Sequence, residues 1–129
     1  REDKLKEFFD AAHSYEQTPK NAFLHWANFE EEYYELTDEL SAKAYVENEA
    51  IENKDPIVTF SRENLVKEMA DVQYTLSALA LYHGVDLEEA FNRVHANNMS
   101  KLIDGKIVRA ENGKVLKPEG YVKADTRGL

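Results

Sequence analysis

The clearest pattern in the sequence is an apolar stripe that begins at residue 65 and continues to about residue 83. Its members recur at alternating steps of four and three residues, the spacing of one helical face: Leu65, Met69, Val72, Leu76 and Leu79. An upstream stretch repeats this arrangement in the same phase, with Phe29, Tyr33, Leu36 and Leu40. The two stripes predict two long helices that pack against each other through these faces.

The remaining pattern predicts two shorter helices and a hairpin. We expect helices over about residues 2–13, 22–50, 62–83 and 86–102, with a break at 53–59. Ser61 and Asp86 are expected to cap the third and fourth helices, and Gly84 to end the third in a left-handed conformation. Asn112–Gly113 lies between two apolar pairs, which is typical of a β-hairpin. The expected fold class is therefore all-α, a bundle of about four helices with a small C-terminal hairpin and arm.

Periodicity also predicts which side chains of the two shorter helices face inward. In the first helix these are Leu5, Phe8, Phe9 and Ala12, and in the fourth Leu87, Ala90, Phe91, Val94 and Met99. We interpret residues 1–129 as one domain, with a helical body over 1–104 and a hairpin and arm over 105–129.

Carboxylates flank both long stripes. Glu68 and Asp71 each precede a member of the later stripe, and Glu32 and Glu35 hold the matching places upstream. One such pair is usually a solvated helix face, but two pairs in phase would converge when the stripes pack. Like charges brought together repel unless protons or cations intervene, and Mg²⁺ is the oxygen-liganded cation that fits best, with Mn²⁺ as a substitute. Glu31 adds a fifth carboxylate, whose role as ligand, water-orienting base or surface residue the spacing leaves open.

Asn98 and Lys101 lie three residues apart late in the fourth helix. An amide and a lysine near a metal cluster could hold phosphate oxygens. A polar helix end with a lysine near its C-terminal dipole explains the same spacing equally well.

Charge and composition exclude some classes of binding partner and favour others. Residues 1–100 carry 9 basic and 21 acidic side chains, whereas residues 101–129 carry 7 and 4. An acidic body argues against nucleic-acid binding, and a basic tail beside it suits a small polyanion bound as its metal complex. There is no cysteine, no apolar run long enough for a membrane span and no Glu-x-x-His, the last of which argues against a ferritin-like di-iron site. We expect a cytoplasmic protein that does not engage membranes.

Three motifs in order resemble a known superfamily. The Glu31-Glu32-x-x-Glu35, Glu68-x-x-Asp71 and Asn98-x-x-Lys101 runs, and the tail from Gly113 to Tyr121, are similar to those of the all-α nucleotide pyrophosphohydrolases. These include MazG-like and phosphoribosyl-ATP pyrophosphohydrolase-like proteins. Two features differ: the connection from Glu35 to Glu68 is longer than is usual, and Tyr121 stands where tryptophan is common.

The resemblance implies a function and roles for the residues. Glu32, Glu35, Glu68 and Asp71 would bind Mg²⁺, Glu31 would help to position metal or water, and Asn98 and Lys101 would contact substrate phosphates. The expected reaction is hydrolysis of a (deoxy)nucleoside triphosphate to the monophosphate and pyrophosphate by a homodimer or homotetramer. The alternatives are the same chemistry on phosphoribosyl-ATP, or a non-catalytic acidic helical interaction module.

Overall fold

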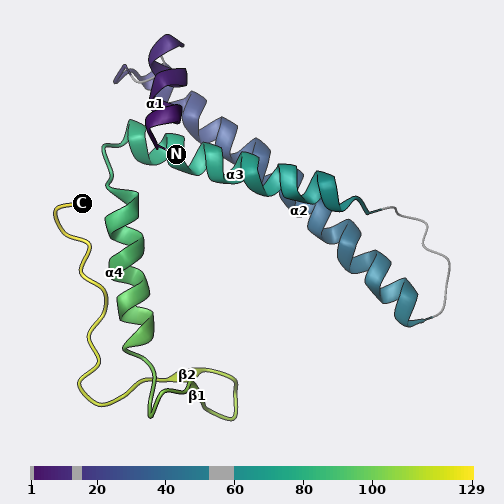
Figure 1. Ribbon diagram of the computed structural model, residues 1–129, viewed down its shortest axis with the longest axis vertical. Coiled ribbons are helices and arrows are strands. Elements are labelled where there is room, and N and C mark those ends of the chain that lie inside the picture. Colours follow the sequence, from purple (N-terminus) through teal and green to yellow (C-terminus); the bar gives the residue numbers. More distant parts are fainter. Residues whose placement is uncertain (1, 13–15, 53–59) are drawn as a thin grey trace. The chain divides into compact units, whose positions relative to one another are not determined.

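The computed structural model of the chain describes residues 2–12, 16–52 and 60–129 (Figure 1). Its elements are α1 (Glu2–Ala11), α2 (Pro19–Ile51), α3 (Arg62–Tyr82), α4 (Leu87–Met99), β1 (Val108–Arg109) and β2 (Val115–Leu116). The predicted all-α fold with a small C-terminal hairpin is confirmed. The break expected at 53–59 lies outside the described residues. Two compact units divide the chain, residues 1–83 and 84–129, and each is described by itself.

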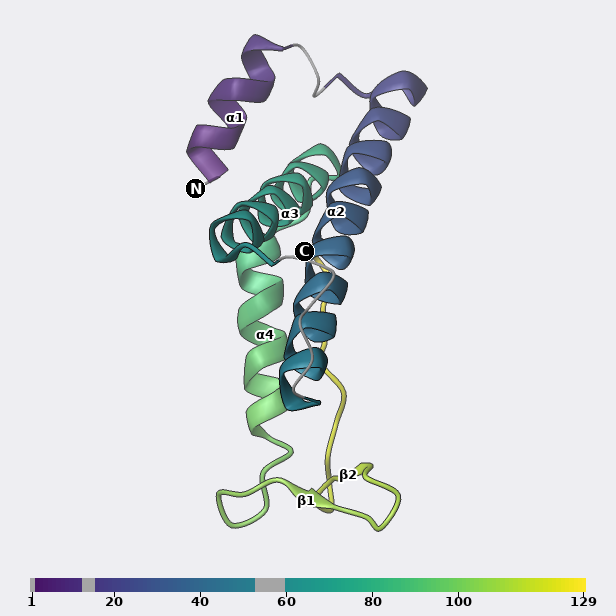
Figure 2. The ribbon, with the colours of Figure 1, turned by 90° about the vertical axis from the view of Figure 1, so that its right-hand side faces the viewer.

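The first unit is built on the pair α2 and α3, which lie side by side in both views (Figures 1 and 2). At one end of the pair, the Tyr82 hydroxyl donates to the carbonyl of Thr18 at 3.2 Å. Farther along α2, Glu39 accepts hydrogen bonds from the backbone of Ser61 and the side chain of Asn64, at the start of α3. The end of α3 therefore lies at the start of α2, whereas the start of α3 lies beside the interior of α2, so the pair is antiparallel.

Local sequence determines where the helices begin and end. The Thr18 hydroxyl accepts from the Asn21 amide at 3.1 Å, and Pro19 occupies the first helical position, where its missing N–H costs nothing. This helix begins three residues before the predicted start for that reason. Ser61 and Asp86 cap α3 and α4 as predicted, and Gly84 has the predicted positive φ, +66°.

The core of the first unit lies where α1 packs on the second half of α3. Leu5, Phe9 and Ala78 are buried there, with Leu81 against them. The prediction that the whole of one α1 face is inward is wrong for Phe8, which is 57% exposed, and for Ala12, which is exposed. Residue 8 is adjacent to Phe9 and projects from the rim of the contact, so only part of the apolar arc is covered.

The stripes of α2 and α3 are only partly covered within this chain. Leu65 is buried, whereas Tyr33, Leu40, Met69 and Leu76 are exposed, which corrects the prediction that each stripe as a whole faces a core. Two packed helices can shield only the side chains on the line between them. The wide apolar arcs of a bundle need a further helix to cover them.

The second unit consists of α4, the hairpin and the C-terminal arm. β1 and β2 pair antiparallel with Val108 opposite Leu116, and Gly113 has φ +85° in the connecting turn, as the Asn112–Gly113 signal predicts. Inward positions were predicted wrongly for α4: Phe91, Val94 and Met99 are exposed. Polar contacts, not these apolar side chains, hold the arm to the helix.

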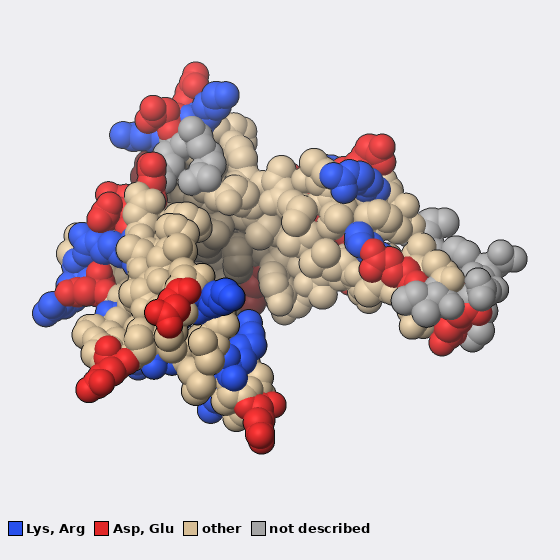
Figure 3. Space-filling model, turned by 60° about the horizontal axis from the view of Figure 1, so that its bottom comes forward, with Lys and Arg blue, Asp and Glu red and all other residues tan. Residues whose placement is uncertain are grey.

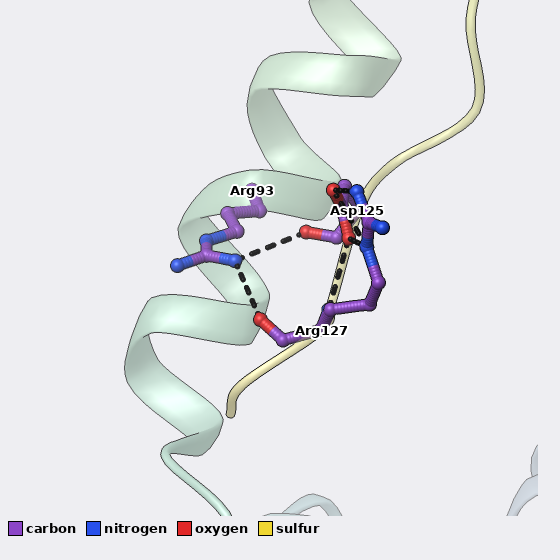
Figure 4. A network of polar contacts seen from close by, with 3 residues as sticks. All are labelled: Arg93, Asp125 and Arg127. Atoms are coloured by element: carbon purple, nitrogen blue, oxygen red, sulfur yellow. Dashed lines mark hydrogen bonds and ion pairs between the residues drawn. The ribbon is translucent and has the colours of Figure 1, made fainter.

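Those contacts come from Arg93 and Asn97. The Arg93 guanidinium donates to the backbone carbonyls of Asp125 and Arg127 at 3.2 and 3.3 Å (Figure 4). The Asn97 amide donates to the Val122 carbonyl at 2.6 Å and accepts from the Tyr121 hydroxyl at the same distance. The arm is thus attached to α4 at two levels. In the described residues, no helix is long and apolar enough to cross a membrane.

Candidate metal centre

Three carboxylates converge where α2 and α3 pack. Glu32 comes from α2, and Glu68 and Asp71 come from adjacent turns of α3. One oxygen atom from each of the three lies within 4.8 Å of the others, a spacing that a single cation could bridge. Glu68 is 7% exposed, and Glu32 and Asp71 are half-buried. The i, i+3 spacing puts both α3 carboxylates on one side of that helix, and the antiparallel packing brings Glu32 to the same level.

Two oxygen atoms of the cluster are buried without a hydrogen-bond partner among the described residues. They are Oε2 of Glu32 and Oε2 of Glu68. Burying such an oxygen without a partner is costly, and most buried polar atoms in proteins are satisfied. Oxygen donors alone, converging in this way, suit a hard divalent cation such as Mg²⁺. The residues present therefore fit a divalent cation.

The pKa shifts of the acids in the cluster are also consistent with a cation site. Burial, a hydrogen-bonding contact with Glu35 and the charges of Glu35, Asp71 and Glu68 raise the pKa of Glu32 from 4.5 to about 7. Burial is also the main cause that raises the pKa of Glu68, followed by an opposing effect of Lys67 and the negative charge of Glu35. Glu35 is itself exposed, but its carboxylate is close enough to act on both neighbours. Negative charges predominate in this group, and a bound cation would offset their mutual repulsion.

Sequence reasoning missed one cation beside the cluster. The Lys67 ammonium lies 2.7 Å from Oδ2 of Asp71 and 3.7 Å from Oε1 of Glu68. Hydrogen bonding to Asp71 raises the pKa of Lys67, as do the charges of Asp71 and Glu68. The Lys67 to Asp71 spacing of four residues on a helix was a readable signal for this pair.

Among the described residues, the group of three does not include Glu31, Asn98 or Lys101. Glu31 is exposed on α2. Asn98 and Lys101 belong to the second unit, where the Lys101 ammonium donates to Oδ1 of Asn98 at 2.8 Å. Asn98 and Lys101 are thus in contact with each other, and their contact with phosphate stays a prediction.

The other basic side chains of the second unit are not gathered in one place. Arg109 donates to the Gly113 carbonyl, and the Lys117 ammonium lies 4.9 Å from the centre of the Tyr121 ring. On the face drawn in Figure 3, the coloured Lys and Arg residues are interspersed with Asp and Glu. This face therefore offers no continuous basic surface among the described residues.

Comparison with known proteins identifies the family. The sequence profile named phosphoribosyl-ATP pyrophosphohydrolase matches residues 3–98, well over half of the 129 residues. That range contains the three converging acids and ends at Asn98. A search of curated proteins finds no match. The chain is therefore a nucleotide pyrophosphohydrolase that belongs to the phosphoribosyl-ATP pyrophosphohydrolase family, within the MazG-like all-α superfamily.

Proposed function

We propose that this protein hydrolyses a (deoxy)nucleoside triphosphate to the nucleoside monophosphate and pyrophosphate with Mg²⁺ as cofactor. The observation that carries the proposal is the pair of buried oxygens of Glu32 and Glu68, which have no hydrogen-bond partner among the described residues, beside Asp71. A cation would satisfy these oxygens, and a cation held by carboxylates is how proteins commonly present Mg²⁺ to phosphates. Mn²⁺ is expected to substitute.

Each residue of the proposed site has its own role in the reaction. Glu32, Glu68 and Asp71 hold the cation, and Glu35 adds its negative charge from the edge of the cluster. A divalent cation, when bound, neutralises phosphate charge and lowers the pKa of water. Glu31 helps to position the metal or the attacking water. Asn98 and Lys101 contact substrate phosphates, and the Lys101 ammonium stabilises the charge that develops on the departing pyrophosphate.

The same proposal includes an assembly and a location. The stripe residues Tyr33 and Leu40 on α2, and Met69 and Leu76 on α3, are exposed in one chain. Helices of a second copy are the covering that a bundle of this kind needs, so the working form is a homodimer or homotetramer. We place it in the cytoplasm, where its nucleotide substrates are found.

A comparison of substrates tests the proposal. Initial rates of pyrophosphate release are measured with Mg²⁺ for a panel of ribo- and deoxyribonucleoside triphosphates and for phosphoribosyl-ATP. At least one free triphosphate is expected to give the highest kcat/KM. Cation binding without turnover of any substrate would contradict the proposal and would favour an acidic helical interaction module.

Phosphoribosyl-ATP is the second candidate substrate, favoured by the description of the matching family profile. It carries the same triphosphate chain, so the same acids and the same cleaved bond would serve. This reading predicts strong preference for phosphoribosyl-ATP over every free triphosphate in the same panel.

A further inference from the structure

The Lys67 ammonium contacts a carboxylate that a bound cation would also contact. The ammonium makes a 2.7 Å contact with Oδ2 of Asp71, one of the three acids that converge, and lies 3.7 Å from Oε1 of Glu68. The acids around it, Glu32, Glu35, Glu68 and Asp71, outnumber this one positive charge. Among the described residues, Lys67 therefore acts as a counter-ion to the cluster.

The contact is one that a divalent cation can displace. The Lys67 side chain is 63% exposed, and its flexible stem can carry the ammonium into solvent. Exposed ion pairs of this spacing are weak, whereas a dication between buried carboxylate oxygens is attracted by several full charges. Lys67 and the metal ion also repel each other, so the lysine opposes binding even when it does not occupy the site.

We propose that Lys67 competes with the divalent cation for the Glu32–Glu68–Asp71 cluster and so sets the metal concentration at which the site fills. The inference rests on the proposed function, because it takes these three acids as the cation ligands. Its consequence is that the cluster keeps a partial positive partner when no metal is bound, and that metal binding must release Lys67. A lysine that only oriented Asp71 for the metal would act in the opposite direction and strengthen binding.

Mn²⁺ titration of the full chain, followed by the EPR signal of the free ion, distinguishes these roles. Lys67→Met keeps most of the stem and removes the charge, and we expect it to bind Mn²⁺ about threefold to tenfold more tightly than the wild type. Lys67→Arg keeps the charge and is expected to stay within about twofold of the wild type. The gain in Lys67→Met is expected to shrink as NaCl is raised, because salt screens an exposed charge.

Lys43→Met is the matched control. Lys43 also pairs with an acid four residues away on a helix of the same unit, Glu47. It lies about 16 Å along α2 from Glu32, beyond one Debye length at about 0.1 M salt. Its removal is expected to leave Mn²⁺ affinity within about twofold of the wild type. Circular dichroism checks that each variant is folded.

The outcomes separate the two proposals. Equal or weaker Mn²⁺ binding by Lys67→Met, in a protein whose binding is lost in Glu68→Gln, overturns the competition and leaves the proposed function standing. Equal gains in Lys67→Met and Lys43→Met would also overturn it, since they would show only a general effect of net charge. Absence of any Mn²⁺ binding that depends on Glu68 overturns both proposals together.

Discussion

At the scale of single residues, Glu68 is the member of the acidic cluster with the least access to water. It is 7% exposed, and one of its oxygens has no partner among the described residues. An ionised side chain in this position can offer a full negative charge and an otherwise unbonded oxygen to a bound cation. The cluster therefore depends on Glu68 more than on Glu35, which is exposed.

Replacement of Glu68 tests this dependence. Glu68→Gln is expected to lower turnover by at least about 100-fold while the fold is kept, because it removes a buried ligand charge and not a packed side chain. Pyrophosphate release measures the turnover, and circular dichroism the fold. Asp38→Asn, an exposed acid on α2, is the control and is expected to retain wild-type activity. Full Mg²⁺-dependent activity in Glu68→Gln would refute the site.

Glu32 gives the metal-free protein a distinct pH dependence. Its folded-state pKa of about 7 lies above the ordinary 4.5, so between these values the folded protein holds a proton that the unfolded chain has lost. The contribution of Glu32 to stability in EDTA is therefore fully present below the lower value and is lost as pH rises through about 7. Thermal unfolding between about pH 5 and about pH 8 measures this loss.

Glu32→Gln provides the check on that dependence. Without the ionisable group the fall with pH is expected to flatten, and at the upper end of the range the variant is more stable than the wild type by about 1 kcal/mol, or about 4 °C in Tm. An unchanged pH profile in Glu32→Gln would show that Glu32 is not the titrating group.

Sequence pattern could predict which acids converge, because helical phase and stripe packing are periodic properties. Glu32, Glu68 and Asp71 lie together in the structure as their phase predicts. The contact of Lys67 with Asp71 follows from the same helical geometry, since the two are four residues apart, but the approach of the ammonium to Glu68 does not. Whether Glu31 acts in the site stays a prediction, because an exposed helix position does not define a role.

At the scale of elements, Glu39 connects the two long helices at the start of α3. Its two oxygens accept from the Ser61 amide at 3.2 Å and from the Asn64 side chain at 2.9 Å. The first turn of a helix has amide groups that lack partners within the helix, and a carboxylate also suits the positive end of the helix dipole. Glu39 thus fixes α3 against α2 on the far side of the cluster from α1.

Removal of this contact is expected to weaken the helix pair. Glu39→Ala is predicted to lower the free energy of unfolding by about 1 kcal/mol, the usual cost of losing a helix cap. Urea denaturation gives the value. Glu47→Ala, which removes only an exposed pair with Lys43 on one helix, is the control and is expected to cost less than about 0.5 kcal/mol. Equal losses in the two variants would rule out a special role for Glu39.

The C-terminal arm offers a second test at this scale. Arg93 donates to two backbone carbonyls of the arm (Figure 4), and its loss leaves both without that donor. Arg93→Ala is expected to speed amide hydrogen exchange in residues 121–129 by about tenfold while the exchange of α2 and α3 is unchanged. Arg109→Ala, which loses a contact within the hairpin turn, is the control. An unaltered arm in Arg93→Ala would show that Asn97 and Tyr121 suffice to hold it.

The helices were predictable because their signals are local. Caps at Ser61 and Asp86 and the left-handed Gly84 depend on neighbours within one turn. The arm was expected from the sequence, but its attachment to α4 was not, since the contacts of Arg93 and Asn97 join residues that are distant in sequence. Burial was predicted less well than helices, because periodicity indicates an apolar face without saying what covers it.

At the scale of the whole molecule, the exposed stripe residues give the prediction for assembly. Leu40 is 44% exposed on α2, and a charge there is incompatible with burial in an interface between copies. The wild type is expected to have a mass of about two or four times the 14.8 kDa of one chain, and Leu40→Glu a mass shifted toward that of one chain. Light scattering after size exclusion measures both.

Ser41→Glu is the control for added charge, since Ser41 is the exposed polar neighbour of Leu40. It is expected to keep the wild-type mass. A wild type with the mass of one chain at micromolar concentration would contradict the proposed assembly, and the exposed stripe would then need another partner.

The central claim is cleavage between the α and β phosphates of a nucleotide at the Glu32–Glu68–Asp71 cluster. ³¹P NMR of the products, with Mg²⁺ and the best substrate of the panel, tests it most directly. We expect resonances of a nucleoside monophosphate and pyrophosphate in equal amounts, and expect both to be absent with EDTA and in Glu68→Gln. Orthophosphate with a nucleoside diphosphate, or unchanged products in Glu68→Gln, would contradict it.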